Sequence, residues 1–250
     1  MNKLMFIYQI LIEYDGTNYV GWQKQKNGIS IQETIEKALE KILKHPILLY
    51  GSGRTDSGVH AIEQSAHFKT SYKIKNLNNF LNSINYFLND KYISILYIKK
   101  KNINFHARFN VKKRIYEYLI VNRLASLSLD INKAWHVKSK LNLKLMQSAA
   151  KLLKGTKDFS TFRSSSCGAK SPIKTIEISK VKKKNKKIII TFCSKSFLQQ
   201  QVRSMVGCLK YVGEKKWTLK YFKKIIKLKK RSKCAPPAPA SGLYLKKIFY

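Results

Sequence analysis

The stretch LMFIYQILIEY, residues 4–14, is almost continuously apolar and has the length of one buried strand. Further along, Ser30 and Glu33 form the pattern of a capping box, in which each side chain can bond the other residue's backbone N–H at the start of a helix. Apolar residues then recur with helical spacing, so we expect a helix here. The members of this apolar face are Ile31, Ile35, Ala38, Leu39, Ile42 and Leu43.

The same two kinds of pattern continue along the chain. Short apolar or alternating runs predict strands, and apolar residues spaced three or four apart predict helices. In the first half they predict strands at 47–50, 64–69 and 92–98 and a helix at 77–88. In the second half they predict strands at 114–121, 173–181, 187–193 and 243–249 and helices at 143–153, 198–209 and 219–228. The lysine run Lys182–Lys187 is interpreted as an exposed hairpin turn, since such runs are most often solvated.

Each half therefore has the order strand, helix, strand, strand, helix, strand. This order predicts an α/β (α+β) fold with two ferredoxin-like βαββαβ halves that share a mixed, mainly antiparallel sheet. The two halves show no repeat in sequence, so the prediction rests on element order. We expect one half at 1–104 and the other at 105–250, because the strand that closes the first half ends in Lys99-Lys100-Lys101.

The composition excludes several classes of protein. Of the 250 residues, 44% are hydrophobic and 12% aromatic, which is enough to bury a core and excludes a disordered basic tail. No apolar run approaches the ~20 residues of a membrane span. The run Leu4–Ile12 lacks a small-residue cleavage site, which favours a strand over a signal peptide. The four cysteines are far apart without a CxxC pair, so we expect no disulfide scaffold or zinc site and a cytoplasmic location.

The charge is strongly unbalanced, with 50 Lys and Arg against 13 Asp and Glu and a formal net charge of +37. Lys, Ile and Asn are all frequent, so part of the Lys excess is explained equally well by an AT-rich coding sequence. Coding bias does not explain the scarcity of acids, whereas a polyanion partner would offset the repulsion within the fold. We therefore favour nucleic acid as the partner.

The loop GSGRTDSGVHA, residues 51–61, combines three glycines with an acid and an arginine. Glycines allow positive φ and close approach to a ligand. Asp56 is the only acid between Glu40 and Glu63, and it can serve as a nucleophile or an acid/base group. Arg54 can pair with it and hold its orientation. An equally acceptable interpretation from the spacing is an Asx-type turn, in which Asp56 bonds only nearby N–H groups.

The same loop resembles the active-site signature of TruA-type tRNA pseudouridine synthases, which usually reads GRTDAGVHA. Further blocks of the chain are similar to that family in the expected order and cover nearly its whole length. Six blocks in order are very improbable by chance. They are YDGT and GWQ at 14–23, FHARF at 105–109 with RIYEY at 114–118, DFSTFR at 158–163, CGAKSP at 167–172, FLQQQVRSMVG at 197–207 and APASGLYL at 238–245.

The resemblance implies a pseudouridine synthase fold and an enzyme that isomerises uridine at tRNA positions 38, 39 and 40, in the anticodon arm. It implies a homodimer with no cofactor and no metal. By this resemblance Asp56 is the nucleophile, Arg54 helps to displace the base and contacts the RNA, and Arg203 pairs with the aspartate. Tyr116 and Leu245 are expected to contact the substrate. Without the resemblance, Tyr116 would be interpreted as a core tyrosine and Arg203 as a solvated helix residue. Against the second interpretation, Gln199, Arg203 and Gly207 form a face beside the apolar stripe, as a residue at the edge of a cleft requires.

Two segments, 105–109 and 168–172, correspond to tRNA contacts in the family. The sequence also departs from the family at two positions. Ser57 stands in place of the usual alanine, and Gly168 in place of glutamine, which predicts the loss of one polar contact to tRNA. The histidines His60, His67, His106 and His136 lack metal-ligand spacing and are expected to pack or to face RNA. The expected tRNA-binding residues are Arg54, Phe105, His106, Ala107, Arg108, Phe109, Gly168, Ala169, Lys170, Ser171 and Pro172, with Arg108 and Lys170 as phosphate contacts.

Two rival functions stay open at this point. Ferredoxin-like sheets also build non-catalytic RNA-binding modules, but we find no stretch of the RRM type, K/R-G-F/Y-G/A-F-V-x-F/Y, in the chain. A member of the family that has lost its activity is the second rival. The intact set of Arg54, Asp56, Tyr116 and Arg203 argues against it.

Overall fold

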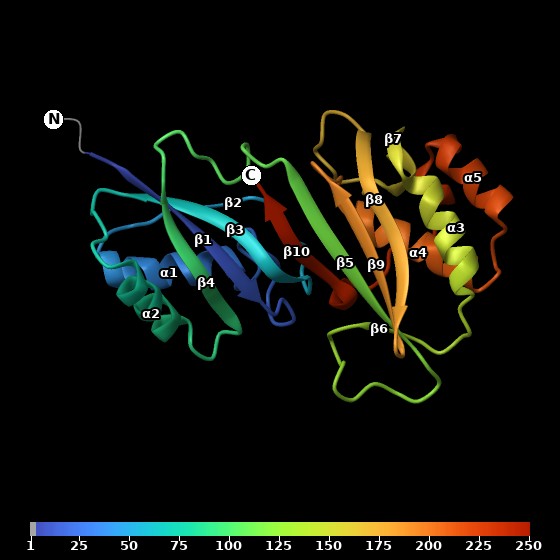
Figure 1. Ribbon diagram of the computed structural model, residues 1–250, viewed down its shortest axis with the longest axis horizontal. Coiled ribbons are helices and arrows are strands. Elements are labelled where there is room, and N and C mark those ends of the chain that lie inside the picture. Colours follow the sequence, from blue (N-terminus) through green and yellow to red (C-terminus); the bar gives the residue numbers. More distant parts are fainter. Residues whose placement is uncertain (1–3) are drawn as a thin grey trace. The chain divides into compact units, whose positions relative to one another are not determined.

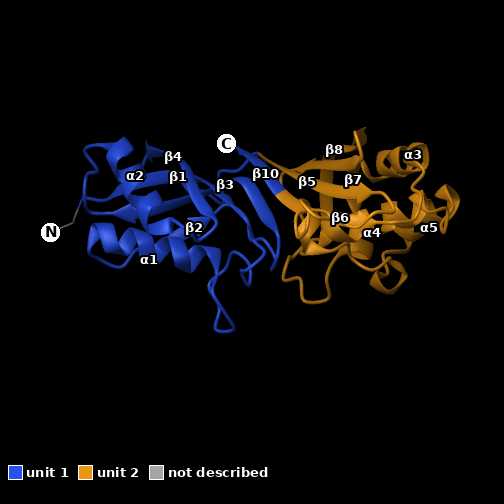
Figure 2. Cartoon of the chain, turned by 90° about the horizontal axis from the view of Figure 1, so that it is seen from below, with its two compact units in different colours: residues 1–112, 245–250 blue, residues 113–244 orange. Residues whose placement is uncertain are grey.

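The computed structural model describes residues 4–250, and within them five helices and ten strands form (Figure 1). Most of the strand pairs are antiparallel, and helices pack on the strands, so the expected α+β class is confirmed. None of the helices in this described part has the length and hydropathy to cross a membrane. The chain divides into two compact units, coloured separately in Figure 2. Unit 1 comprises residues 1–112 and 245–250, and unit 2 comprises residues 113–244.

Unit 1 is built around one central strand. Strand β1 (Phe6–Tyr14) lies between β4 (Ile93–Lys101) and β3 (His60–Thr70), antiparallel to both. Ile10 of β1 lies opposite Ala66 and Ile98, and its side chain has no exposed surface. On the other side, β3 pairs with the short β2 (Leu49–Gly51) and is followed in the sheet by β10 (Leu243–Phe249).

The helices of unit 1 begin where side chains cap them. Helix α1 (Ile31–Leu43) has Ser30 as its N-cap, and the Ser30 hydroxyl accepts a hydrogen bond from the Glu33 N–H at 3.2 Å. This contact confirms the predicted start of the helix. Helix α2 (Leu77–Leu88) begins at Asn76 in the same way, packs on β4 and contacts α1. The apolar faces of both helices are buried, as their periodicity predicts.

Unit 2 also combines mainly antiparallel strands with helices. The antiparallel order is β5 (Lys113–Asn122), β9 (Lys187–Ser194), β8 (Ile173–Lys184) and β7 (Gly155–Asp158), and β6 (Trp135–Val137) pairs parallel with β5. Helix α3 (Leu143–Leu153) packs on β8 and on α4 (Gln201–Gly213), and α5 (Leu219–Leu228) contacts both helices. Short 3₁₀ turns lie at 160–162, 231–233 and 240–242.

Several boundaries differ from the sequence predictions. The hairpin expected at 182–187 is tighter, because β8 continues through Lys184 and the turn needs only Asn185 and Lys186. Asn185 has a φ of 55°, a left-handed conformation that asparagine tolerates well. Helix α4 begins at Gln201 rather than at 198, because Gln200 has a φ of 59° and interrupts the helical backbone. Strands β6 and β7, with three and four residues, were not predicted.

The structure divides the units after residue 112, whereas the sequence predicts a division after residue 104. The reason is that the segment between these positions packs on unit 1. The Ala107 N–H donates to His67 Nδ1 at 3.1 Å, and the Lys112 N–H donates to the Phe249 carbonyl at 2.8 Å. The final residues 245–250 also belong to unit 1, where the Tyr250 hydroxyl donates to the Ala107 carbonyl at 2.8 Å.

Candidate active site

The loop that carries Asp56 connects β2 to β3 in unit 1 and is held by backbone hydrogen bonds. Asp56 forms an isolated antiparallel bridge with Gly21. Beside it, the Trp22 N–H donates to the Thr55 carbonyl at 3.0 Å, and the Val59 N–H closes a turn onto the Asp56 carbonyl at 3.2 Å. The backbone of the predicted nucleophile is therefore fixed on both sides by groups of the same unit.

Buried side chains hold the loop through hydrogen bonds. The Gln64 amide donates to the Gly53 carbonyl at 2.8 Å and accepts from the Ser52 hydroxyl at 2.8 Å. The Tyr14 and Thr55 hydroxyls are hydrogen-bonded to each other at 2.8 Å. The side chain of Gln64 has no exposed surface, so its bonds are shielded from competing water. Sequence reasoning missed Gln64, because its position on a strand gives no sign that it faces the loop.

Two glycines are required by this arrangement. Gly21 has a φ of +115°, and a Cβ added there would lie 2.7 Å from the Thr55 carbonyl oxygen. Gly58, inside the loop, has a φ of 74°. Both conformations are strained for residues with a side chain. The block GWQ at 21–23 thus has a structural reason: Gly21 lets the strand-like segment approach Asp56 closely.

The side chains around Asp56 differ in their exposure. Asp56 is partly buried, whereas Arg54 and Ser57 are exposed. The Ser57 hydroxyl donates to the Tyr19 carbonyl at 2.9 Å, so the departure from alanine is accommodated by an added hydrogen bond. Arg54 and Asp56 are brought onto one short loop, as the sequence predicts.

Tyr116 and Arg203 lie in unit 2, each on a regular element. Tyr116 is on β5 opposite Phe192 and is 7% exposed. Its ring meets the Phe197 ring edge-on, with centroids 5.4 Å apart. Such contacts fix the plane of the tyrosine ring. Gln199, which the sequence places on a helical face with Arg203, precedes α4 and is not part of the helix, so that detail of the prediction is wrong.

Arg203 is bonded twice to the segment before β10. Its Nε donates to the Ala238 carbonyl at 2.8 Å, and its own carbonyl accepts from the Ala238 N–H at 3.0 Å. A Cβ added at Gly207 would lie 2.1 Å from the Pro236 carbonyl oxygen, which shows how closely this segment lies on α4. The APASGLYL block therefore meets the helix that carries Arg203.

Tyr118, in the RIYEY block, is bonded to the same segment before β10, a role that the sequence does not indicate. Its hydroxyl donates to the Pro239 carbonyl at 2.7 Å. Burial raises the pKa of Tyr118 well above its usual value, although the positive charge of Arg203 acts in the opposite direction. The hydroxyl therefore remains protonated and can donate at neutral pH. Leu245, expected at the substrate, is fully buried on β10.

The segment Phe105–Phe109 forms an aromatic cluster on unit 1. His67 is stacked on Tyr50 at 5.1 Å between ring centroids and meets His106 at 4.7 Å, and His106 lies 4.3 Å from Phe109. Burial, assisted by the nearby charges of His106 and Lys69, lowers the pKa of His67 to about 4. His67 is thus neutral at pH 7, and its Nδ1 is available to accept the Ala107 N–H.

The outer members of the aromatic cluster face solvent. Phe109 is 71% and Tyr50 is 42% exposed, and the Arg108 guanidinium lies 5.7 Å from the centre of the Phe109 ring. An exposed aromatic ring beside cations is the combination on which proteins stack nucleic-acid bases. Phe105 and His106 are partly buried, and Ala107 between them and Phe109 is fully buried.

The loop 163–172 in unit 2 carries the second set of predicted tRNA contacts. Arg163 holds it from inside, since its Nη2 donates to the Cys167 and Ala169 carbonyls. Gly168 and Lys170 are exposed. A Cβ added at Gly168 would have no atom within 4 Å. Arg163 thus holds the loop together with backbone bonds such as that from the Ser164 N–H to the Gln199 carbonyl at 3.1 Å, while Gly168 and Lys170 remain exposed.

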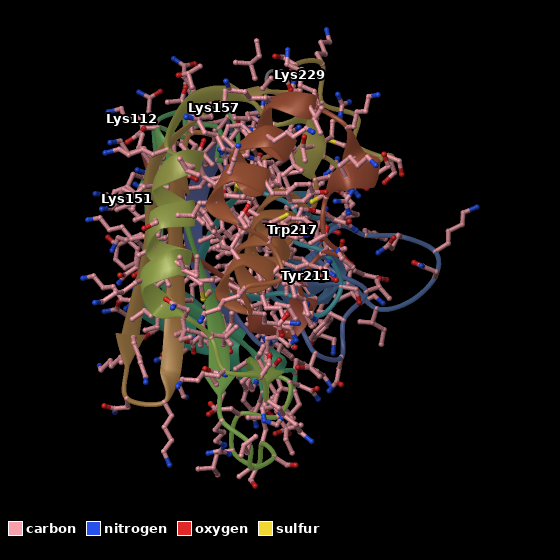
Figure 3. All side chains as sticks on the ribbon, turned by 90° about the vertical axis from the view of Figure 1, so that its right-hand side faces the viewer. Lys112, Lys151, Lys157, Tyr211, Trp217 and Lys229 are labelled. Atoms are coloured by element: carbon pink, nitrogen blue, oxygen red, sulfur yellow. The ribbon has the colours of Figure 1, made fainter. Side chains whose placement is uncertain are left out.

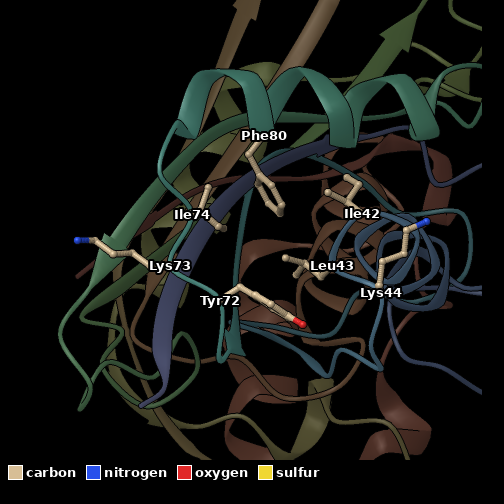
Figure 4. Close-up of a pocket in the computed structure, with 7 residues that line it drawn as sticks. All are labelled: Ile42, Leu43, Lys44, Tyr72, Lys73, Ile74 and Phe80. Atoms are coloured by element: carbon tan, nitrogen blue, oxygen red, sulfur yellow. The ribbon is translucent and has the colours of Figure 1, made fainter. Parts of the chain in front are cut away.

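Two further basic residues of unit 2 and one hollow of unit 1 are not among the predicted site residues. Lys151 is exposed on α3, and Lys229 forms an ion pair with Asp158 at 3.4 Å (Figure 3). Within residues 4–250, no group of three or more His, Cys, Asp or Glu side chains is arranged to hold a metal. The hollow encloses ≈ 370 Å³ and contains none of the predicted site residues (Figure 4). It is lined by Ile42, Leu43, Lys44, Tyr72, Lys73, Ile74 and Phe80.

Comparison with known proteins decides the family. The model of the tRNA pseudouridine synthase family matches residues 10–110 and 149–250. The chain belongs to the tRNA pseudouridine synthase family. A protein named tRNA pseudouridine synthase A from Pelagibacter ubique (strain HTCC1062) is 59% identical over 246 residues, which are 98% of this chain and 100% of that protein.

More distant relatives carry the same name. The one from Ehrlichia chaffeensis (strain ATCC CRL-10679 / Arkansas) is 44% identical over 246 residues, or 97% of this chain and 99% of the relative. The one from Maricaulis maris (strain MCS10) is 42% identical over 243 residues, 97% of each chain. Both matched segments of the family model contain a predicted site: Asp56 lies in the first and Arg203 in the second. The resemblance seen in the motifs is therefore confirmed, and the chain is an RNA-modifying isomerase of this family.

Proposed function

We propose that this synthase converts uridine to pseudouridine at positions 38, 39 and 40 in the anticodon arm of tRNA, with Asp56 as the reacting carboxylate. The observation that carries the proposal is the fixed loop in which Asp56 is bridged to Gly21. A pre-positioned carboxylate avoids the entropic cost of ordering it during the reaction. The relatives that share the family support the substrate class, since each is named a tRNA pseudouridine synthase.

The reaction moves one bond without net oxidation or reduction. The glycosidic bond between N1 and C1′ breaks, the uracil turns, and C5 bonds to C1′. C5 then loses its proton and N1 gains one, so the atoms balance. Asp56 can attack C1′, attack C6, or assist elimination, and each route needs its ionised carboxylate. Because no external group is transferred, the proposal includes no cofactor and no metal.

Three further residues complete the proposed chemistry. Arg54, exposed beside Asp56, has a planar guanidinium that can fill the space left by an extruded base and offset its unstacking energy. Tyr116 and Leu245 are assigned to the uracil, for which an aromatic face gives support without blocking rotation. Arg203, whose Nε is held by the Ala238 carbonyl, is assigned as the cationic partner of the reacting carboxylate.

Binding of the tRNA is assigned to Phe105–Phe109 and Gly168–Pro172. Phe109 and Tyr50 offer exposed rings, while Arg108 and Lys170 offer charges for phosphates. The proposal also includes a homodimer and a cytoplasmic location, as the family resemblance implies. The non-catalytic RNA-binding alternative has no specific observation in its favour.

The proposal is tested by mapping pseudouridine in bulk tRNA that lacks the modification, incubated with and without the protein. We expect new pseudouridine at positions 38, 39 and 40 and at no position outside the anticodon arm. Modification elsewhere in the tRNA would contradict the proposed site of action. Binding without any modification would favour the non-catalytic alternative.

A further inference from the structure

Two cysteines far apart in sequence meet inside unit 2. Cys208, on α4, has no exposed surface, and Cys234 follows the 3₁₀ turn Arg231–Lys233 and is partly exposed. Their sulfur atoms are 3.4 Å apart. Neither cysteine has a role in the proposed isomerisation, which uses no thiol. The proposed isomerisation therefore does not explain why the two sulfurs lie so close together.

The surroundings make the two sulfurs chemically unequal. The hydrogen bond to Cys208 lowers the pKa of Cys234, and the charge of the Arg231 guanidinium lowers it further, while burial acts in the opposite direction. Burial raises the pKa of Cys208. Of the two thiols, Cys234 therefore loses its proton more readily than Cys208. A partly exposed thiol of lowered pKa, 3.4 Å from a second sulfur, is the arrangement found in redox-sensitive sites.

We propose that Cys208 and Cys234 form a site of reversible oxidative modification, in which a hydroperoxide such as hydrogen peroxide links them as a disulfide. The Cys234 thiolate attacks one peroxide oxygen, the O–O bond breaks, and hydroxide leaves and is protonated to water. Cys234 is then a sulfenic acid. The Cys208 sulfur attacks the Cys234 sulfur, and the sulfenic oxygen leaves as water with the thiol proton. The two thiols lose two electrons, and the peroxide is reduced to two waters.

The disulfide would fasten the segment before β10 to α4. A disulfide bond is ~2.05 Å long, so the two sulfurs must approach further as the bond forms. Four residues after Cys234, Ala238 is bonded to Arg203 through both its N–H and its carbonyl. The covalent link therefore lies next to the contact that holds Arg203, and it restrains the same segment.

The experiment is peptide mapping of the purified full chain by mass spectrometry after brief treatment with hydrogen peroxide and alkylation of free thiols. We expect a peptide pair linked through Cys208 and Cys234, which dithiothreitol separates. Cys193, which is buried and whose pKa is raised by burial, should remain a free thiol and serves as the internal control. A Cys234 sulfinic or sulfonic acid without the link, or links that involve all four cysteines equally, would overturn the proposal.

Two variants test which sulfur reacts with the peroxide in protein that is still folded. In Cys208→Ser, which keeps a small buried group, Cys234 should accumulate as a sulfenic acid that dimedone traps. The matched control Cys193→Ser should form the Cys208–Cys234 link at the wild-type rate. Failure of dimedone to label Cys234 in folded Cys208→Ser would overturn the assignment of Cys234 as the attacking sulfur. Hydrogen exchange of the Ala238 amide should slow on oxidation, and an unchanged rate would overturn the proposed fastening.

Discussion

The loop that carries Asp56 and the loop that carries Lys170 are held in different ways. The first has a backbone bridge to Gly21 and rests on the fully buried Gln64. The second is held by Arg163, and at Gly168 a methyl group would touch nothing. The difference matches the proposed tasks, because a reacting carboxylate needs a fixed position, whereas a phosphate contact tolerates movement of a long side chain.

Substitution of the reacting group should have the largest effect. Asp56→Asn keeps the size of the side chain but removes the charge, so turnover should fall by at least ~10⁴-fold, the upper range for a proton-transfer group. Affinity for tRNA should stay near that of the wild type. The measurement is single-turnover pseudouridine formation together with a binding isotherm. Ser57→Ala, in the same loop, is the control and should retain activity; full activity in Asp56→Asn would refute the assignment.

The second prediction tests whether Arg54 acts on the base or on a phosphate. Arg54→Lys keeps the charge but loses the planar group, so turnover on a paired target uridine should fall roughly 10–100-fold, which corresponds to an unstacking energy of a few kcal/mol. The loss should shrink when the target is mismatched, because less unstacking is needed. Single-turnover rates on matched and mismatched anticodon arms measure both. Equal losses on the two arms would leave Arg54 as an orienting partner of Asp56.

The third prediction compares Gln64 and Arg163, the side chains that hold the two loops. Gln64→Leu leaves the partly buried Gly53 carbonyl without its amide donor and the buried Ser52 hydroxyl without its acceptor, so the free energy of unfolding should fall by ~1–3 kcal/mol. Arg163→Gln acts on a loop near the surface, so its cost should be smaller, while affinity for tRNA falls. Urea unfolding and tRNA binding of both variants test the contrast. If Arg163→Gln proves the more destabilising, the two loops do not differ as described.

The smallest effect is expected at the open loop. Lys170→Gln removes one exposed charge, so the slope of log K against log salt should decrease by ~0.7–0.9, the value for one phosphate. The choice of target uridine should not change. Fluorescence anisotropy over a salt series gives the slope, with Lys151→Gln, on α3 and outside the proposed contacts, as the control. A slope identical to that of the wild type would mean that Lys170 is only solvated.

Much of the fold follows from local sequence patterns. The capping box at Ser30 predicts the start of α1 because the deciding contact is between residues three apart. The start of α4 could not be predicted in this way, since the left-handed Gln200 interrupts an unbroken apolar pattern. Strands β6 and β7 are too short to show a period, and they exist because neighbouring strands offer them partners.

At the candidate site, too, local sequence patterns fail to predict contacts between distant residues. Asp56, Arg54, Tyr116 and Arg203 stand out by their motifs. The contacts that support the site do not, because Gln64 and Tyr118 bond residues distant in sequence. Gln64 lies 11 residues from the carbonyl it binds, and Tyr118 lies 121 residues from its acceptor. Sequence identifies the groups that react, whereas the structure is needed to identify the groups that hold them.

The most direct test of the account compares two glycine substitutions in single-turnover pseudouridine formation on one anticodon arm. Gly21→Ala places a methyl group 2.7 Å from the Thr55 carbonyl at a φ of +115°, so it should displace the Asp56 loop and reduce turnover ~10²-fold in protein that is still folded and still binds tRNA. Gly168→Ala meets no atom and should leave turnover unchanged. Equal rates for the two variants would contradict the claim that the fixed loop positions the reacting carboxylate.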